Sequence, residues 1–136
     1  MHLVYQRRKQ HLYKVLIIED DEQLLKMYQR LFTLNGYESR GLATGEDALQ
    51  IALNNKPHVI LLDIMLPSYD GMSILLSLKQ HPATKDCMVI MLTNVAMQEE
   101  KEKSYAHGAD MYLIKNDHDP MQLFSLVHNA VKKFYN

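Results

Sequence analysis

The sequence has little of the residue types that mark disulfide-rich, fibrous or low-complexity chains. Its 136 residues include one cysteine, Cys87, no tryptophan, five glycines and four prolines. A single thiol excludes an internal disulfide and is typical of a reducing compartment. The chain also lacks internal repeats and Gly/Ser linkers, which excludes fibrous and disordered classes. What remains is an ordinary globular protein.

Long hydrophobic runs and an excess of one charge are also missing. No apolar stretch reaches the roughly 20 residues that a membrane helix needs, and the N-terminus has no signal-peptide apolar region. The formal net charge is -1, which gives no electrostatic reason to bind nucleic acid or an anionic membrane. We therefore expect a cytoplasmic protein without membrane contact and without direct nucleic-acid binding.

The length and composition indicate one folded domain. Hydrophobic residues make up 47% of the chain and charged residues 23%, and 136 residues are enough for one core of ordinary size. Residues 1–13 include the basic run Gln6–Gln10 and show no period, so we interpret them as an N-terminal extension. Residues 14–136 then form the domain.

Strand and helix signals alternate along that domain. The expected strands are 14–18, 37–41, 58–62, 88–92 and 111–114, each followed by a helical pattern. Five such units predict an α/β fold, a doubly wound (βα)5 domain with a five-stranded parallel sheet in the order 2-1-3-4-5.

Local signals place the ends of several helices. The first helix begins at the acidic pair Asp21-Glu22 and ends at Asn35-Gly36, with an apolar stripe of Leu24, Met27, Tyr28 and Leu31. The segment 44–47 resembles a capping box for the second helix. The last helix has Asp119 as its cap and Pro120 at its first position.

Carboxylates follow two of the predicted strands. Glu19, Asp20 and Asp21 come after the first strand and Asp63 after the third. In the predicted strand order these two strands are neighbours, so Asp20 and Asp63 would lie close together and repel. A hard divalent cation relieves such repulsion, and Mg²⁺ accepts one or two carboxylates while keeping water and phosphate oxygens. The sequence therefore predicts a Mg²⁺ site, with Mn²⁺ as an alternative ion.

A hydroxyl and an ammonium group follow the fourth and fifth strands at the same edge. Thr93 follows the fourth strand and Lys115 follows the fifth. Lys115 can pair with Asp63 and later with a phosphoryl oxygen, and the Thr93 hydroxyl can donate a hydrogen bond to the same group. Together with a carboxylate nucleophile and a metal, these groups predict phosphoryl transfer.

These residues resemble the receiver domain of two-component response regulators, whose fold is flavodoxin-like. The resemblance covers residues 14–134. Its motifs are Glu19-Asp20-Asp21 after the first strand, Asp63-Ile-Met-Leu-Pro67 followed by Asp70-Gly71, then Leu92-Thr93, and Gly108 to Lys115 with Tyr112 inside that last run.

The resemblance implies a role for each matching residue. Asp63 is the expected phosphoacceptor, and Thr93 and Lys115 assist the transfer. The expected metal ligands are Glu19, Asp20, Asp63 and the backbone carbonyl of Met65, with Asp20 a direct ligand and Asp21 a helix-start residue, although the run of three acids leaves this register open by one. Thr93 and Tyr112 are the expected switch residues. The domain is then not an enzyme but a phosphoprotein that assists its own phosphorylation and dephosphorylation.

The resemblance also implies partners for a phosphorelay. A histidine kinase or histidine phosphotransfer protein would phosphorylate Asp63, and the face formed by the fourth helix, fifth strand and fifth helix would carry the signal. No output domain follows Asn136, so we expect the signal to pass to an output protein, or an output domain to have been truncated. The domain is expected to be a monomer or a weak homodimer.

The sequence departs from the family pattern at three points. Asn116 stands where the family usually has a proline after a cis bond, so we predict a trans bond or a strained cis bond there, and a repositioned Lys115. Asn94 is larger than the usual residue after Thr93 and is expected to narrow access to Asp63. Met65 and Val95 cannot orient an attacking water, which predicts slow hydrolysis of the aspartyl phosphate.

Two other functions remain open. One is a receiver-like interaction module that works without phosphorylation, which Asn94 and Asn116 favour and the intact acidic residues oppose. The other is an aspartate-nucleophile phosphatase. Such enzymes have an Asp-x-Asp motif that begins at the nucleophile, and here Met65 stands at the place of the second aspartate. Dinucleotide binding is not supported, because no Gly-rich turn follows the first strand.

Overall fold

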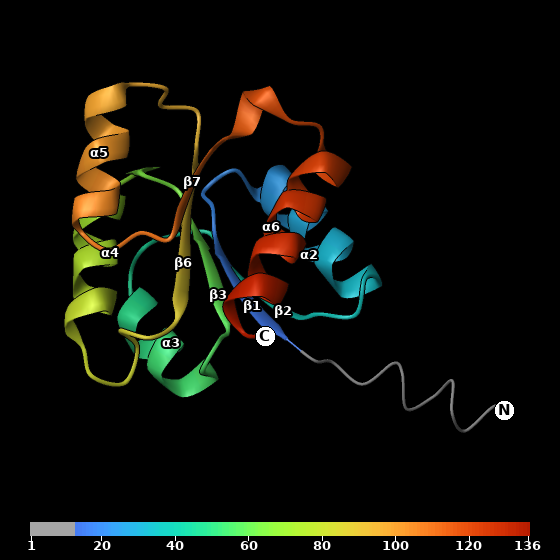
Figure 1. The fold of residues 1–136 in the computed structure, drawn as a ribbon, viewed down its shortest axis with the longest axis horizontal. Helices are drawn as coiled ribbons and strands as arrows, with labels where there is room; N and C mark the ends of the chain where they lie inside the picture. The colour runs from blue at the N-terminus through green and yellow to red at the C-terminus, as the bar shows by residue number, and fades with distance from the viewer. Residues whose placement is uncertain (1–12) are drawn as a thin grey trace, which may run out of the picture.

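Five parallel strands form the central sheet of the protein, which a computed structural model describes from residue 13 to residue 136 (Figure 1). Their order in the sheet is β2-β1-β3-β6-β7, which confirms the predicted order 2-1-3-4-5, and every pairing within it is parallel. Their bounds are β1 Lys14–Ile18, β2 Glu38–Leu42, β3 Val59–Leu62, β6 Met88–Thr93 and β7 Met111–Ile114. The predicted bounds agree to within one residue at each end.

Helices cover both faces of the sheet (Figure 1). On one side lie α2 (Glu22–Leu34) and α6 (Pro120–Phe134), and on the other α3 (Ala48–Asn55), α4 (Gly71–Gln80) and α5 (Gln98–Ala106). The side chains of β1, β3 and β6 alternate between two hydrophobic clusters, one under each helical layer. This double burial explains why these strands are continuous apolar runs.

Side-chain caps begin two of the helices as predicted. The Asp21 carboxylate accepts hydrogen bonds from the backbone N–H groups of Gln23 and Leu24, both at 3.1 Å. Asp119 accepts from the Gln122 backbone at 2.9 Å, and the Gln122 side chain accepts from the Asp119 backbone, a full capping box.

The capping box expected at residues 44–47 is wrong. Helix α3 begins at Ala48, and Asp47 before it has a left-handed backbone (φ 61) and makes no side-chain cap. The Thr44 hydroxyl instead accepts from the Glu46 backbone N–H at 3.2 Å. Such short-range bonds compete with helix capping and hold the segment in a turn.

The buried stripe of α2 also differs from the prediction. Leu25, Tyr28 and Phe32 are the buried residues, whereas Met27 is 39% exposed. The helix contains the adjacent apolar pairs Leu24-Leu25 and Leu31-Phe32, so two stripes one residue apart fit the same spacing. Leu24 and Leu31 are partly buried against the same cluster, so packing against the sheet shifts the centre of the buried stripe by one residue and leaves Met27 outside it.

A short hairpin between β3 and α4 was not predicted. Its strands are β4 (Met65–Leu66) and β5 (Tyr69–Asp70), which pair antiparallel. Pro67 and Ser68 form the turn, with Ser68 at φ 65, as in turns that place proline second and a left-handed residue third. Strands of two residues are too short to show a period in a sequence.

The expected N-terminal extension lies almost wholly outside the described residues, so the division after residue 13 stays a prediction. Tyr13 itself is described, and its carbonyl accepts a hydrogen bond from the Glu38 backbone N–H at 3.0 Å. Its ring packs against Tyr37 and His58. Among residues 13–136, no helix combines the length and apolar character required to cross a bilayer.

Candidate functional site

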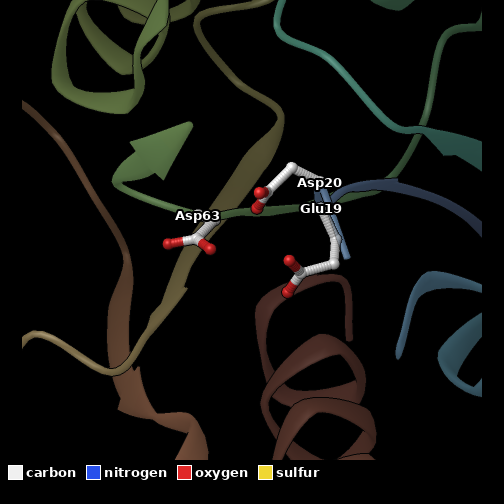
Figure 2. Close-up of side chains that lie close together, drawn as sticks. All are labelled: Glu19, Asp20 and Asp63. Carbon is white, nitrogen blue, oxygen red and sulfur yellow. The ribbon is translucent and has the colours of Figure 1, made fainter. Parts of the chain in front are cut away.

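Three carboxylates meet at the edge of the sheet where β1 and β3 end (Figure 2). These strands pair with Ile18 opposite Leu62, so the next residues, Glu19 and Asp63, emerge side by side. Each of Glu19, Asp20 and Asp63 offers an oxygen, and these oxygens lie within 4.8 Å of one another. Glu19 and Asp63 are buried, at 2% and 5% exposure, whereas Asp20 is open to solvent.

The Lys115 ammonium joins two of these carboxylates. Its Nζ lies 2.5 Å from Glu19 Oε1 and 2.9 Å from Asp63 Oδ2. Lys115 follows β7, at the same edge of the sheet but beyond β6. An ammonium group has three donors and no acceptor, so it satisfies both carboxylates at once.

Burial and pairing shift the ionisation of this group of residues in defined directions. Burial raises the pKa of Glu19 above its ordinary value, although hydrogen bonds from Lys115 and the Asp21 backbone act to lower it. Burial acts to lower the pKa of Lys115, but its hydrogen bonds to Asp63 and Glu19 outweigh this effect and raise it. Lys115 therefore stays protonated at neutral pH.

The residues present fit a hard divalent cation. The site offers carboxylate oxygens on Glu19, Asp20 and Asp63. Among residues 13–136, Lys115 is the one cation in an ion pair with this group, through Glu19 and Asp63. The carboxylates therefore outnumber the paired ammonium by two. Mg²⁺ and Mn²⁺ prefer oxygen ligands of this kind, and a soft metal would need thiolate or imidazole ligands. An acidic pocket of this kind suits the expected cofactor.

The main chain around Asp63 is fixed by close packing. Its Oδ1 accepts from the Met65 backbone N–H at 3.1 Å, and the Gly71 N–H donates to the Ile64 carbonyl at 3.0 Å. A Cβ at Gly71 would lie 2.2 Å from the Asp63 carbonyl oxygen, so only glycine permits this approach. Met65 contributes backbone here, since its side chain is 67% exposed.

The two expected switch residues are linked through one loop residue, Val95. The Thr93 hydroxyl, buried at the end of β6, accepts from the Val95 backbone N–H at 3.3 Å. The Tyr112 hydroxyl donates to the Val95 carbonyl at 2.6 Å. Burial, with smaller contributions from Glu100 and Asp63, raises the pKa of Tyr112, so this phenol is a donor at neutral pH. Thr93 and Tyr112 thus hold the same stretch of main chain.

The departures Asn94 and Asn116 contact each other. The Asn116 backbone N–H donates to Asn94 Oδ1 at 3.0 Å. Residues 13–136 contain no cis peptide bond, so the Lys115–Asn116 bond is trans, which was one of the two expected outcomes. Lys115 nonetheless reaches Asp63.

One residue near the site was assigned only a packing role from the sequence. Tyr28 of α2 is buried, and burial raises its pKa, while Lys115 lowers it and Glu19 and Asp63 raise it. The phenol therefore lies within the field of the charged group. Its place in an apolar helical stripe did not indicate that charged residues lie near it. A sequence period shows which residues share a helix face but not which residues pack against that face.

Comparison with known proteins decides the family. The model of the response regulator receiver domain matches residues 15–128. The chain belongs to this family. The fold, the strand order and the acidic residues after β1 and β3 are those that the resemblance implied, and the receiver domain is the signal-receiving part of a two-component system.

Individual receivers show the same similarity. The chain is 33% identical over 101 residues to the polar-differentiation response regulator DivK of Brucella anthropi, covering 74% of this chain and 82% of that one. It is 28% identical over 102 residues to the transcriptional regulatory protein SrrA of Staphylococcus aureus. That match covers 75% of this chain but 41% of SrrA, so this chain corresponds to a part of the larger regulator.

Solved structures agree with the fold. A response regulator from Chloroflexus aurantiacus superimposes with a TM-score of 0.79 at 33% identity, covering 88% of this receiver and 98% of that chain. A CheY-like receiver domain from Methanospirillum hungatei gives a TM-score of 0.82 at 28% identity, covering 91% and 97%. The receiver described here therefore has the CheY-like form of the flavodoxin-like fold.

Proposed function

We propose that this receiver takes a phosphoryl group on Asp63 from a phosphohistidine of a partner histidine kinase or phosphotransfer protein. The observation that carries the proposal is the Asp63 carboxylate itself, which is buried, held by Lys115 at 2.9 Å and placed beside Glu19 and Asp20. A buried carboxylate with a fixed ammonium partner and an acidic pocket beside it suits an anionic nucleophile that works near a metal.

The transfer itself is a displacement at phosphorus. A carboxylate oxygen of Asp63 forms the new P–O bond, the P–N bond to the donor imidazole breaks, and the imidazole leaves with the electron pair. Glu19, Asp20, Asp63 and the Met65 carbonyl would hold Mg²⁺, or Mn²⁺ in its place, which neutralises phosphoryl charge when bound. Lys115 keeps its proton and moves its hydrogen bond from the carboxylate to a phosphoryl oxygen.

The new phosphoryl group would also act as a switch. Its oxygens would accept a hydrogen bond from the Thr93 hydroxyl, which here accepts one from the Val95 backbone N–H at 3.3 Å. Movement of Thr93 shifts Val95, whose carbonyl holds Tyr112. The signal then reaches the face formed by α5, β7 and α6, where an output protein or a truncated output domain would bind.

Several expectations go with this proposal. The receiver acts as a phosphoacceptor that assists its own phosphorylation and dephosphorylation rather than as an enzyme with a separate substrate. Its cytoplasmic location and its state as a monomer or weak homodimer stay predictions. The rival aspartate-nucleophile phosphatase has no support from the site, because the side chain at position 65 is an exposed methionine.

The test is direct phosphorylation by a small donor. The receiver is incubated with acetyl phosphate and Mg²⁺, and the intact mass is followed beside that of Asp63→Ala. Asp86→Ala is the matched control, since Asp86 is an exposed aspartate before β6, at the opposite edge of the sheet. We expect one phosphoryl adduct in the wild type and in the control, and none in Asp63→Ala. No adduct should form in any of the proteins when EDTA is present from the start of the incubation.

Reductive trapping with borohydride and peptide mapping would place the adduct on Asp63. An adduct that persists in Asp63→Ala would disprove the assignment of the acceptor. Absence of any adduct, with small donors and with phosphorylated histidine proteins, would favour the interaction module that works without phosphorylation.

A further inference from the structure

The hydrogen bond between Asn94 and Asn116 joins the two strand ends that carry Thr93 and Lys115. Strands β6 and β7 pair with Thr93 opposite Ile114, so Asn94 and Lys115 are the next residues on each strand. The Asn94 carboxamide then reaches one residue further and accepts the Asn116 N–H at 3.0 Å. The two residues are 22 positions apart in the sequence.

The Asn116 N–H bonds to a side chain and not to a backbone carbonyl. It belongs to the first turn of the short 3-10 helix η1 (Lys115–Asp117), whose observed backbone closure runs from the His118 N–H to the Lys115 carbonyl. The first N–H groups of a helix have no partner within the helix and need one from outside. The carboxamide of Asn94 thus serves as a cap that comes from the neighbouring strand rather than from the preceding residue.

Lys115 is the group on which such a cap would act. Its ammonium donates to Glu19 Oε1 and Asp63 Oδ2 at once. A long, flexible side chain keeps both bonds only while its backbone is held within reach of both acceptors. We propose that Asn94 is a positioning residue. Its carboxamide accepts a hydrogen bond from the Asn116 N–H, a contact that we call the clasp, and so fixes the main chain from which Lys115 reaches Asp63.

This inference rests on the proposed function, because a fixed Lys115 side chain matters only if Lys115 binds the phosphoryl group on Asp63. The clasp leaves the carboxylates themselves untouched, since Asn94 is not among the residues of the acidic cluster. It acts through Lys115, which pairs with Glu19 and Asp63, two of the proposed metal ligands, so the transfer rate is compared at saturating Mg²⁺. Loss of one neutral, solvent-exposed hydrogen bond corresponds to a rate effect of about three- to tenfold.

The experiment measures phosphorylation rate and amide exchange in matched asparagine variants. Asn94→Ala removes the acceptor, whereas Asn116→Ala removes a side chain but keeps the N–H. Asn35→Ala is a second control, because Asn35 is exposed and its side chain also bonds to backbone, the Leu31 carbonyl at 2.8 Å, at the far end of α2. Rates with acetyl phosphate, the Kd for Mg²⁺ and hydrogen exchange at the Asn116 amide are recorded for each.

At saturating Mg²⁺ we expect Asn94→Ala to slow adduct formation about three- to tenfold and to speed hydrogen exchange at the Asn116 amide. Both control variants should react at the wild-type rate. In a Lys115→Ala background, Asn94→Ala should produce no further slowing, because the group that it positions is gone.

Two results would overturn the inference while the proposed function stands. One is an Asn94→Ala protein that reacts at the wild-type rate. The other is equal slowing by Asn94→Ala with and without Lys115, which would mean that Asn94 acts elsewhere. A wild-type protein that takes no adduct at all would reject the proposed function, and this inference with it.

Discussion

The same strands carry opposite chemistry at their two ends. At the carboxyl edge of the sheet, ionised groups follow β1, β3 and β7, namely Glu19, Asp63 and Lys115. At the amino edge, the residues just before β1, β2 and β3 are rings, namely Tyr13, Tyr37 and His58. The carboxyl edge gathers three carboxylates around one ammonium. At the amino edge the charges form separate pairs, Lys14–Glu38 and Lys79–Asp110, beside the aromatic contacts.

The amino-edge rings belong to one connected network, which we call the aromatic network. Tyr13 packs edge-on against His58, and His58 packs edge-on against Tyr135 of the C-terminal segment. The Tyr135 hydroxyl donates to the His58 carbonyl, and the Lys14 N–H donates to His58 Nδ1 at 2.9 Å. Its members are Tyr13, Phe32, Tyr37, His58, Phe124, His128, Phe134 and Tyr135.

The difference shows where stability and activity are located. Buried rings remove apolar area from water and gain from edge-to-face geometry. Three carboxylates lie within 4.8 Å of one another with one paired ammonium, Lys115. Part of their repulsion therefore remains, and a bound cation would relieve it. Variants at the two edges should therefore separate folding from function.

The largest effect is expected from Phe32→Ala in the aromatic network. Phe32 is fully buried, and its ring packs edge-on against Tyr37 and Phe124 at 5.0 and 4.9 Å. Truncation of such a side chain leaves a cavity, and the free energy of unfolding should fall by about 3–5 kcal/mol. Urea denaturation measures this loss. The fraction that stays folded should still accept a phosphoryl group, and a loss below about 1 kcal/mol would contradict the comparison.

The second effect is expected from Asp20→Asn at the carboxyl edge, with the opposite sign. Because one of three neighbouring carboxylates is neutralised, the metal-free variant should be more stable than the wild type. Mg²⁺ at 100 times its Kd should stabilise the wild type by about 2.7 kcal/mol and the variant far less. Thermal unfolding with and without Mg²⁺ checks both statements, with Asp86→Asn as the control. Equal stabilisation of the two proteins by Mg²⁺ would show that Asp20 is not a metal ligand.

A third, smaller effect concerns the lifetime of the phosphorylated state. The Met65 side chain is exposed beside the site and cannot orient water. Met65→Asn adds a carboxamide that can do so, and the half-life of the aspartyl phosphate should shorten roughly threefold, the worth of one modest hydrogen bond. The decay of the phosphorylated mass measures this, with Met65→Leu as the control. An unchanged half-life would show that position 65 does not limit hydrolysis.

The smallest effect concerns pH at the amino edge. Burial, with a smaller contribution from Lys132, lowers the pKa of His128 below its ordinary value of 6.5, and Tyr37 Oη lies 2.7 Å from its Nδ1. The native protein therefore favours the neutral ring. This contribution to stability is present above pH 6.5 and is lost as the pH falls through the lowered pKa.

Denaturation curves between pH 7.5 and 5 should show the loss in the wild type and a flatter dependence in His128→Gln. All other ionisable groups are common to the two proteins, so the difference between their pH dependences is due to His128. Parallel curves would mean that the Tyr37–His128 contact does not favour the neutral ring.

The sequence was sufficient for most features that depend on neighbours along the chain, with the turn at residues 44–47 as the exception. Glu19, Asp63 and Lys115 directly follow apolar runs, and parallel strands put such residues at one edge of the sheet. Asp119 and Pro120 begin α6 because capping depends on a few adjacent residues. The same locality explains why strand bounds were predicted to within one residue.

Other features depend on contacts between distant residues, and the sequence could not decide them. The choice of Leu25 rather than Leu24 as the buried residue of α2 depends on the sheet below the helix, and the tight approach of Gly71 to Asp63 depends on the β4–β5 hairpin. Asn94 and Asn116 read as two separate departures from a family pattern, although they form one hydrogen bond.

The sequence by itself determined that four polar residues, Asp63, Glu19, Thr93 and Lys115, end strands at one edge of a parallel sheet, because strand direction and residue order are local properties. Only the tertiary structure decided that Lys115, predicted to pair with Asp63, also binds Glu19, that Val95 links Thr93 to Tyr112, and that Asn94 accepts the Asn116 N–H. Such bonds form between atoms that folding brings within about 3 Å, and separation along the chain carries no information about that distance.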